Sequence, residues 1–123
     1  MKAADTFPVR RVYDPPGEAD GVRVLVDRLW PRGISKERAA VDEWLKAVTP
    51  SGELRKWFHR HRDEYEEFGR RYRAELEGPE QQDGIEHLRE LAAAGKVTLV
   101  TAVKDVEHGH LPTLRAVLAG ERI

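Results

Sequence analysis

Residues 22–33 read VRVLVDRLWPRG, and this stretch decides the fold. Side chains alternate between the two faces of a strand, and both faces of this one begin with valine or leucine. The pattern predicts a strand over residues 22–30, buried on both sides as in a parallel sheet. Burial makes charge costly, yet Asp27 and Arg28 enter just before a proline and a glycine end the run. Since α/β proteins bind ligands where their strands end, these charges predict a site.

A second apolar run, VTLVTAV at residues 97–103, has the β-branched composition of a central buried strand. Helical periodicity fills the interval between the two runs, with a short amphipathic helix expected over residues 35–48. A longer apolar series over residues 54–76 contains a capping pair at Asp63, which divides it into two helices. This order predicts a βαβ crossover between strands 22–30 and 97–103, with both strands parallel in one sheet.

Three further elements complete the predicted fold. A short strand is expected over residues 7–13, a helix ending at Gly95, and a last helix ending at Gly120. We therefore predict an α/β fold, in which a small mixed or parallel sheet has helices packed on it. Residues 1–7 lack periodicity and are expected to form a flexible N-terminal lead, and residues 8–120 a single compact α/β domain.

Composition limits the classes of function. The chain has 123 residues, and its 21 lysines and arginines are balanced by 22 acids, giving a net charge of −1. That balance gives the protein no overall positive electrostatic potential, which non-specific nucleic-acid binding requires. Nucleic acid is therefore not favoured as a partner. The absence of cysteine excludes disulfides and thiolate chemistry. Without a signal-like segment or an apolar stretch of membrane length, we expect a cytoplasmic protein that does not associate with membranes.

Polar side chains follow both predicted strands where those strands end. Because the carboxyl ends of parallel strands share one edge of a sheet, we expect these side chains to meet in one crevice. The last helix begins nearby, so its free backbone N–H groups would add to an anion site. The eight residues of this predicted site are Asp27, Arg28, Trp30, Arg32, Lys104, Asp105, His108 and His110.

The cations and the tryptophan of this set predict ligand binding. Arg28, Arg32 and Lys104 favour a phosphate or carboxylate as the ligand. Trp30 would stack on a ring of the ligand, or it belongs to the hydrophobic core.

The acids and histidines predict proton transfer or positioning. Asp27 and Asp105 would orient the cations or act as a base, and His108 or His110 would move a proton. The structural alternatives are a buried ion pair that fixes the strand end and solvated histidines in a helix cap. The spacing from Asp105 to His110 matches no recognised metal motif, so we predict no metal. The sequence assigns no cofactor.

Two other motifs have structural interpretations. Ser51 is expected to cap a helix, because no base close to it in the sequence would make it a nucleophile. The basic run at residues 56–62 is interleaved with aromatic residues, as in some nucleic-acid sites. The acids at residues 63–67 cancel most of its field, so a solvated helix junction is favoured.

Five segments carry a family resemblance: VDRLWPRG, KERAAVDEWLK, TPSGELRKWF, EYEEFGRRY and VTLVTAVKDVEHGH. They resemble the YeaO-like family of small bacterial proteins, a branch of a larger domain-of-unknown-function family, over roughly Val9 to Leu118. The resemblance implies a compact α/β fold and a bacterial cytoplasmic protein, and it supplies no activity. Relatives commonly carry asparagine where this chain has Gly109, and distant members carry a Cys-His-Arg turn that lacks its cysteine here.

We therefore predict binding of an anionic, phosphate-bearing or nucleotide-like small molecule at the carboxyl edge of the sheet, with or without chemistry on it. The alternative, from a different class, is a non-catalytic module that binds nucleic acid or a protein partner. The first prediction requires residues 27–32 and 104–110 to meet in one crevice, whereas the second requires an exposed basic or apolar surface. The sequence leaves the reaction and the oligomeric state open.

Overall fold

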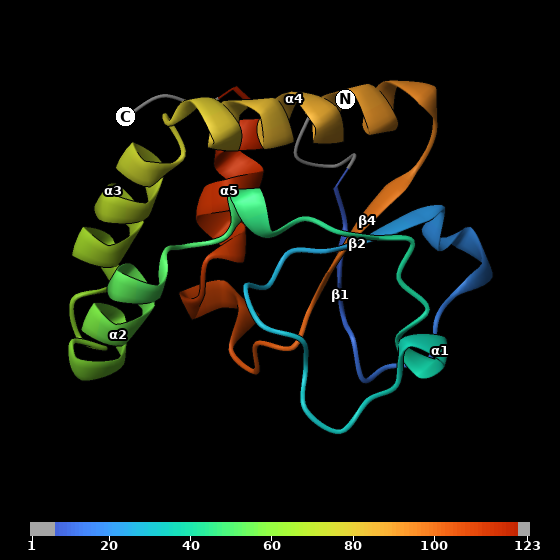
Figure 1. Cartoon of the computed structure of the whole chain (residues 1–123), viewed down its shortest axis with the longest axis horizontal. Helices are drawn as coiled ribbons and strands as arrows, with labels where there is room; N and C mark the ends of the chain where they lie inside the picture. Colours follow the sequence, from blue (N-terminus) through green and yellow to red (C-terminus); the bar gives the residue numbers. More distant parts are fainter. Residues whose placement is uncertain (1–6, 121–123) are drawn as a thin grey trace.

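Four parallel strands form one sheet in the order β1-β4-β2-β3 in the computed structural model, which describes residues 7–120 (Figure 1). β4 pairs with both β1 and β2, and its register places Val97 opposite Val22 and Val100 opposite Leu25. The predicted α/β class and the βαβ crossover are confirmed. The strands are β1 (Val9–Arg11), β2 (Val22–Leu25), β3 (Glu43–Trp44) and β4 (Val97–Thr101).

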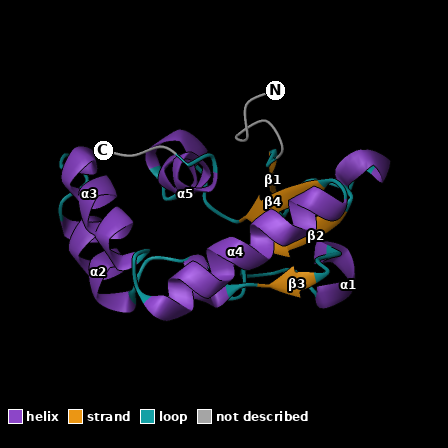
Figure 2. Ribbon diagram, turned by 90° about the horizontal axis from the view of Figure 1, so that it is seen from above, coloured by secondary structure: helices purple, strands orange, loops and turns teal. Residues whose placement is uncertain are grey.

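Helices cover both faces of this sheet unequally (Figure 2). α2 to α5 pack on one face, and the short α1 lies on the other. No helix within residues 7–120 is both long and apolar enough to cross a membrane. The α-helices are α1 (Lys36–Ala39), α2 (Gly52–Arg60), α3 (Tyr65–Glu75), α4 (Pro79–Ala94) and α5 (Leu111–Leu118), and three 3₁₀ turns are η2 (Glu18–Asp20), η3 (Lys46–Val48) and η4 (Val106–His108).

The alternation along β2 explains the two apolar faces read from its sequence. Val24 and Val26 belong to the large core beneath α2 to α5. Leu25 belongs to a small core on the opposite face, together with Val100 and Ile34. A parallel strand that is covered on both sides has no polar face, so its sequence becomes a continuous apolar run.

The predicted strand over residues 22–30 is too long. β2 ends at Leu25, and Val26 N makes one further bond to Val100 O at 3.0 Å. Beyond it, the backbone N–H of Ala102 donates to the side chain of Asp27, so a carboxylate takes the position that a strand carbonyl would occupy. Trp30 therefore lies in a loop that turns at Gly33, where φ is 73°.

The predicted helix over residues 35–48 is far too long, and only its first turn, α1, forms an α-helix. α1 stops after four residues, because Ala40 adopts a left-handed conformation with φ of 51°. The chain then returns to the sheet, where Asp42 N donates to Arg23 O and β3 pairs with β2. Val41 packs against the small core, whereas Val48 packs in the large core. The helical spacing therefore reflected two different cores, and the interval between β2 and β4 is not purely helical.

The other predicted helices are found near their expected positions. Ser51 caps α2, because its Oγ accepts from Leu54 N at 3.1 Å. The long apolar series is divided into α2 and α3, and both place their aromatic residues in the large core. α4 ends before Gly95 as expected.

The amino-terminal strand is shorter than residues 7–13, and it pairs with β4. Residues 1–6 of the predicted flexible lead lie outside the described residues. The last residue of that lead, Phe7, is buried in the large core with 2% of its surface exposed.

Candidate functional site

A cleft of about 1170 Å³ opens at the carboxyl edge of the sheet. Its walls are α2 on one side and the loops that follow β2 and β4 on the other. All eight residues of the predicted site line this cleft. The two segments that the crossover was expected to bring together therefore do meet.

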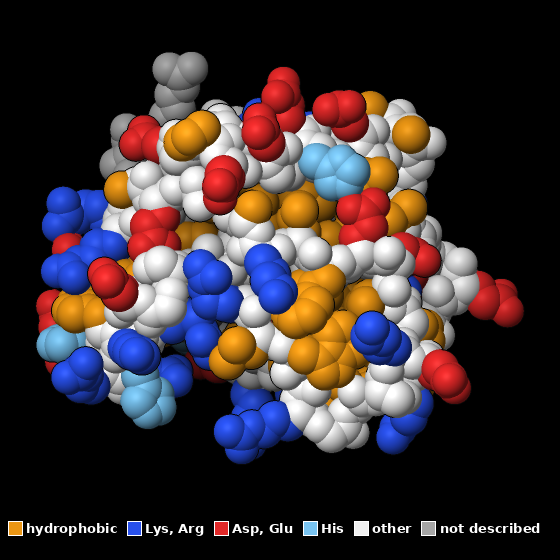
Figure 3. Space-filling view, in the orientation of Figure 1, with side chains coloured by type: hydrophobic (Ala, Val, Ile, Leu, Met, Phe, Trp, Pro, Cys, Tyr) orange, Lys and Arg blue, Asp and Glu red, His pale blue; other side chains and the backbone are white. Residues whose placement is uncertain are grey.

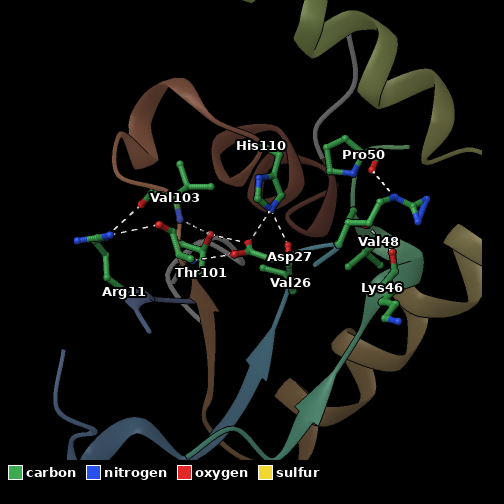
Figure 4. A network of polar contacts seen from close by, with 12 residues as sticks. Arg11, Val26, Asp27, Lys46, Val48, Pro50, Thr101, Val103 and His110 are labelled. Atoms are coloured by element: carbon green, nitrogen blue, oxygen red, sulfur yellow. Dashed lines mark hydrogen bonds and ion pairs between the residues drawn. The ribbon is translucent and has the colours of Figure 1, made fainter. Parts of the chain in front are cut away.

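Asp27 joins the ends of β2 and β4 at the base of the cleft (Figure 4). One of its carboxylate oxygens accepts from Thr101 Oγ1 at 2.6 Å, and the other accepts from Ala102 N at 2.7 Å. Within residues 7–120, Asp27 forms no ion pair with an arginine. Both oxygens are occupied, so the geometry suits Asp27 to positioning the strand ends and disfavours it as a base.

His110 lies against the same carboxylate from the start of α5 (Figure 4). Its Nε2 is 2.6 Å from Val26 O and 3.6 Å from Asp27 Oδ1. Burial lowers the pKa of His110 below 6.5, assisted by the charge of Arg55 and opposed by Asp27 and by the Val26 carbonyl. Because a carbonyl can only accept, the neutral ring carries its proton on Nε2 and keeps Nδ1 as an acceptor.

His108 and Asp105 form an exposed pair at the rim of the cleft. His108 Nδ1 is 3.0 Å from Asp105 Oδ2, and both side chains are 65% exposed. The ring of Tyr65 contacts the His108 ring edge to face at 5.5 Å, and its hydroxyl donates to Gly109 O at 2.9 Å. An exposed pair of this kind adds little to stability, and its histidine is accessible for proton exchange with a ligand.

Trp30 is tied into the fold beside the cleft. Its Nε1 donates to Ile34 O at 2.8 Å, and its ring lies 5.5 Å from that of Trp44 in an edge arrangement. These contacts fit the core alternative for Trp30, although part of the side chain lines the cleft.

Cations face the cleft from two directions. The loops contribute Arg28, Arg32 and Lys104, which we call the loop wall. The cations are gathered around the hollow between α2 and the sheet (Figure 3). The second set, which we call the α2 wall, consists of Arg55, Lys56, His59 and Arg60 of α2, followed by Arg62.

The balance of charge in the cleft is strongly positive. Seven lysines and arginines line it, against the two carboxylates of Asp27 and Asp105. Among the described residues, none of these seven cations forms an ion pair with an acid. The Nε of Arg28 donates to Pro50 O at 3.1 Å, which orients its guanidinium without neutralising it.

The α2 wall was not predicted from the sequence as part of this site. The nearby acids were expected to cancel its charge, but they do not line the cleft, and Glu67 pairs instead with Arg70 and Arg71. One sequence signal was available. Lys56 and Arg60 are four residues apart, so they share one face of a helix.

Metal-capable side chains are scattered in the part of the chain that the structure describes. Within residues 7–120, no three or more histidine, aspartate or glutamate side chains are grouped as a metal site would require.

Fold and cleft define a parallel α/β protein with a cation-lined cleft at the carboxyl edge of its sheet. A family model, DUF488-N3i, described as the inactive DUF488-N3 subclade, matches residues 6–122. The chain belongs to this subclade of the DUF488 family, and it is YeaO-like, as its motifs predicted.

Two relatives illustrate the similarity. The chain is 46% identical over 101 residues to "Uncharacterized protein YeaO" of Escherichia coli, covering 82% of this chain and 86% of that protein. It is 42% identical over 112 residues to "Uncharacterized protein Rv3073c" of Mycobacterium tuberculosis, covering 91% and 92% respectively. No solved structure matches the chain.

Proposed function

We propose that the cleft binds an anionic, phosphate-bearing or nucleotide-like small molecule at the carboxyl edge of the sheet. One observation carries this proposal: seven cations share the cleft with two carboxylates, and none of the seven has an acid partner among the described residues. Like charges gathered around one cleft give it a positive electrostatic potential, which attracts an anion and is lowered when the anion binds. Arginine also matches the geometry of phosphate with paired N–H donors.

Binding without turnover fits the site better than catalysis. The matching family model is described as inactive. The carboxylate of Asp27 is already occupied by Thr101 and Ala102, so it is poorly placed to accept a proton from a ligand. The exposed pair of His108 and Asp105 is the remaining candidate for proton transfer. The absence of cysteine fits a reducing compartment, in line with a cytoplasmic location.

The test is calorimetric titration of inorganic phosphate and of AMP into the protein. Wild type should bind at least one of them, and an Arg28→Ala, Arg32→Ala double variant should bind it at least about tenfold more weakly, since two charge-assisted contacts are removed. Lys36→Ala with Arg38→Ala is the matched control, because it removes the same charge from exposed residues that do not line the cleft. Absence of binding, or equal weakening in the control, contradicts the proposal.

A further inference from the structure

The two cationic walls of the cleft differ in their position and in their number of charges. The loop wall contributes three cations from the ends of β2 and β4, and the α2 wall contributes four lysines and arginines. Seven cations against the two carboxylates of Asp27 and Asp105 leave the cleft with a net charge of +5. A phosphate monoester carries a charge of only about −1.5 to −2 at neutral pH, so a single phosphate group would leave most of this positive charge without a counter-charge.

The α2 wall stands on a rigid element. Ser51 caps α2 and also donates to Glu75 of α3 at 2.5 Å, which fixes the start of the helix. Phe58 stacks on Phe68 with ring centroids 4.1 Å apart, and the Arg62 guanidinium lies 5.2 Å from the centroid of the Phe58 ring. Cations held on a packed helix lose less freedom when they bind a ligand than cations on a loose chain.

The cleft is also larger than one phosphate group requires. Its volume of about 1170 Å³ is above the range of roughly 300–1,000 Å³ that is common for pockets holding whole small molecules. Its positive charge faces inwards from both sides, so a ligand that spans it meets cations at each end.

We infer that the ligand is a small polyanion with at least two phosphoryl groups, one held by the loop wall and the other by the α2 wall. This inference rests on the proposed function and adds the class of ligand. The surface outside the cleft argues against a nucleic-acid strand as the occupant. The net charge of the chain is −1, and acidic side chains gather over the α4 end of the face in Figure 3, so the basic surface does not extend across α4 on that face.

The experiment compares orthophosphate, pyrophosphate and tripolyphosphate by titration at constant ionic strength. Wild type should bind tripolyphosphate at least about tenfold more tightly than orthophosphate, since the longer anion reaches both walls. A Lys56→Ala, Arg60→Ala double variant should lose this gain and keep the wild-type affinity for orthophosphate. Both residues are exposed, so the variant should fold, and circular dichroism checks that it does.

The outcomes separate this inference from the proposed function. If wild type binds orthophosphate and gains nothing from added phosphoryl groups, the polyanion inference fails and the anion site stands. Equal weakening of orthophosphate and tripolyphosphate in the Lys56→Ala, Arg60→Ala variant also overturns the two-wall assignment. If no phosphate binds at all, both proposals fail.

A single-stranded decanucleotide provides the test for nucleic acid. If it binds more tightly than tripolyphosphate, with a steep salt dependence, the ligand of the cleft is nucleic acid and the polyanion inference is overturned. The Lys36→Ala, Arg38→Ala control should match wild type throughout.

Discussion

At the amino ends of β2 and β4, Arg23 is 4% exposed and each nitrogen of its guanidinium has a partner. Nη1 donates to Asp20 at 2.6 Å, and Nε and Nη2 donate to the carbonyls of Ala40 and Ala39, each at 2.9 Å. Asp20 in turn accepts from Gly17 N at 2.9 Å. At the carboxyl ends of the same two strands, the cleft arginines have no acidic partner among the described residues.

The difference separates two uses of the same side chain. A buried guanidinium must be neutralised within the protein, because its desolvation would otherwise be too costly. A guanidinium that faces an open cleft stays hydrated and keeps its donors for a ligand. The network of Asp20 and Arg23 therefore supports the fold, whereas the two walls of the cleft are available for binding.

The largest expected effect is the loss of stability in Arg23→Ala. This change leaves the carboxylate of Asp20 buried without its closest partner and removes donors from two carbonyls. The free energy of unfolding should fall by about 3–5 kcal/mol, as for other broken buried pairs. Urea denaturation measures it, with Arg38→Ala as an exposed control. A loss below about 1 kcal/mol would show that the amino end does not depend on this pair.

Asp27→Ala should have a smaller effect at the opposite end. It removes the acceptor for the Thr101 hydroxyl and for Ala102 N, both close to the end of β4. Leaving these donors unsatisfied should cost about 2–3 kcal/mol in urea denaturation. Thr101→Val should cost less, because it keeps the bond from Ala102 N to Asp27 and, besides the Thr101 hydroxyl itself, removes only the acceptor of a longer bond from Val103 N at 3.2 Å. If Asp27→Ala leaves stability unchanged, Asp27 does not hold the strand ends together.

The two ends should also respond to acid in different pH ranges. Burial lowers the pKa of His110. As the pH falls below about 6.5, His110 therefore binds a proton in the unfolded chain but not yet in the folded chain. Stability should therefore decline as the pH falls below about 6.5, until the lowered pKa of His110 is reached. His110→Gln should remove this part of the decline, and His59→Gln is the exposed control. An unchanged pH profile in His110→Gln would contradict this assignment.

Asp20 defines the lower pH range. Burial would raise its pKa, but bonds from Gly17 and Arg23, with the charges of Arg10 and Arg23, outweigh that effect and lower the pKa below 3.8. Its contribution to stability is present above pH 3.8 and is lost as the pH falls through the lowered pKa. Asp20→Asn should flatten the unfolding profile there and leave the range near pH 6.5 unaffected. Loss of the upper range in this variant would show that the two ends are coupled.

The smallest expected effect is on the stability of the cleft variants. Arg32→Ala and Arg60→Ala remove exposed cations without an acid partner among the described residues, so unfolding free energies should stay within about 0.5 kcal/mol of wild type. Thermal and urea denaturation measure this. A loss comparable to that of Arg23→Ala would mean that the cleft cations support the fold, and the contrast between the two ends would disappear.

Much of the fold could be read from apolar patterning. The run at residues 22–26 and the run at residues 97–101 are covered on both faces, so their burial is visible in a single sequence. The interval at residues 35–48 could not be read correctly, because its apolar residues serve cores on opposite sides of the sheet. Apolar residues that pack into two different cores can still recur at the spacing of a single amphipathic helix.

The sequence by itself determined that charges stand at the ends of two parallel strands, since chain order and crossover topology place those ends on one edge. Only the tertiary structure decided what each charge does there. In the folded protein the Asp27 carboxylate accepts hydrogen bonds from Thr101 and Ala102. The α2 wall lines the same cleft as the loop wall. Such pairings join residues far apart in the chain, and their choice depends on distances of a few ångströms that local patterns do not encode.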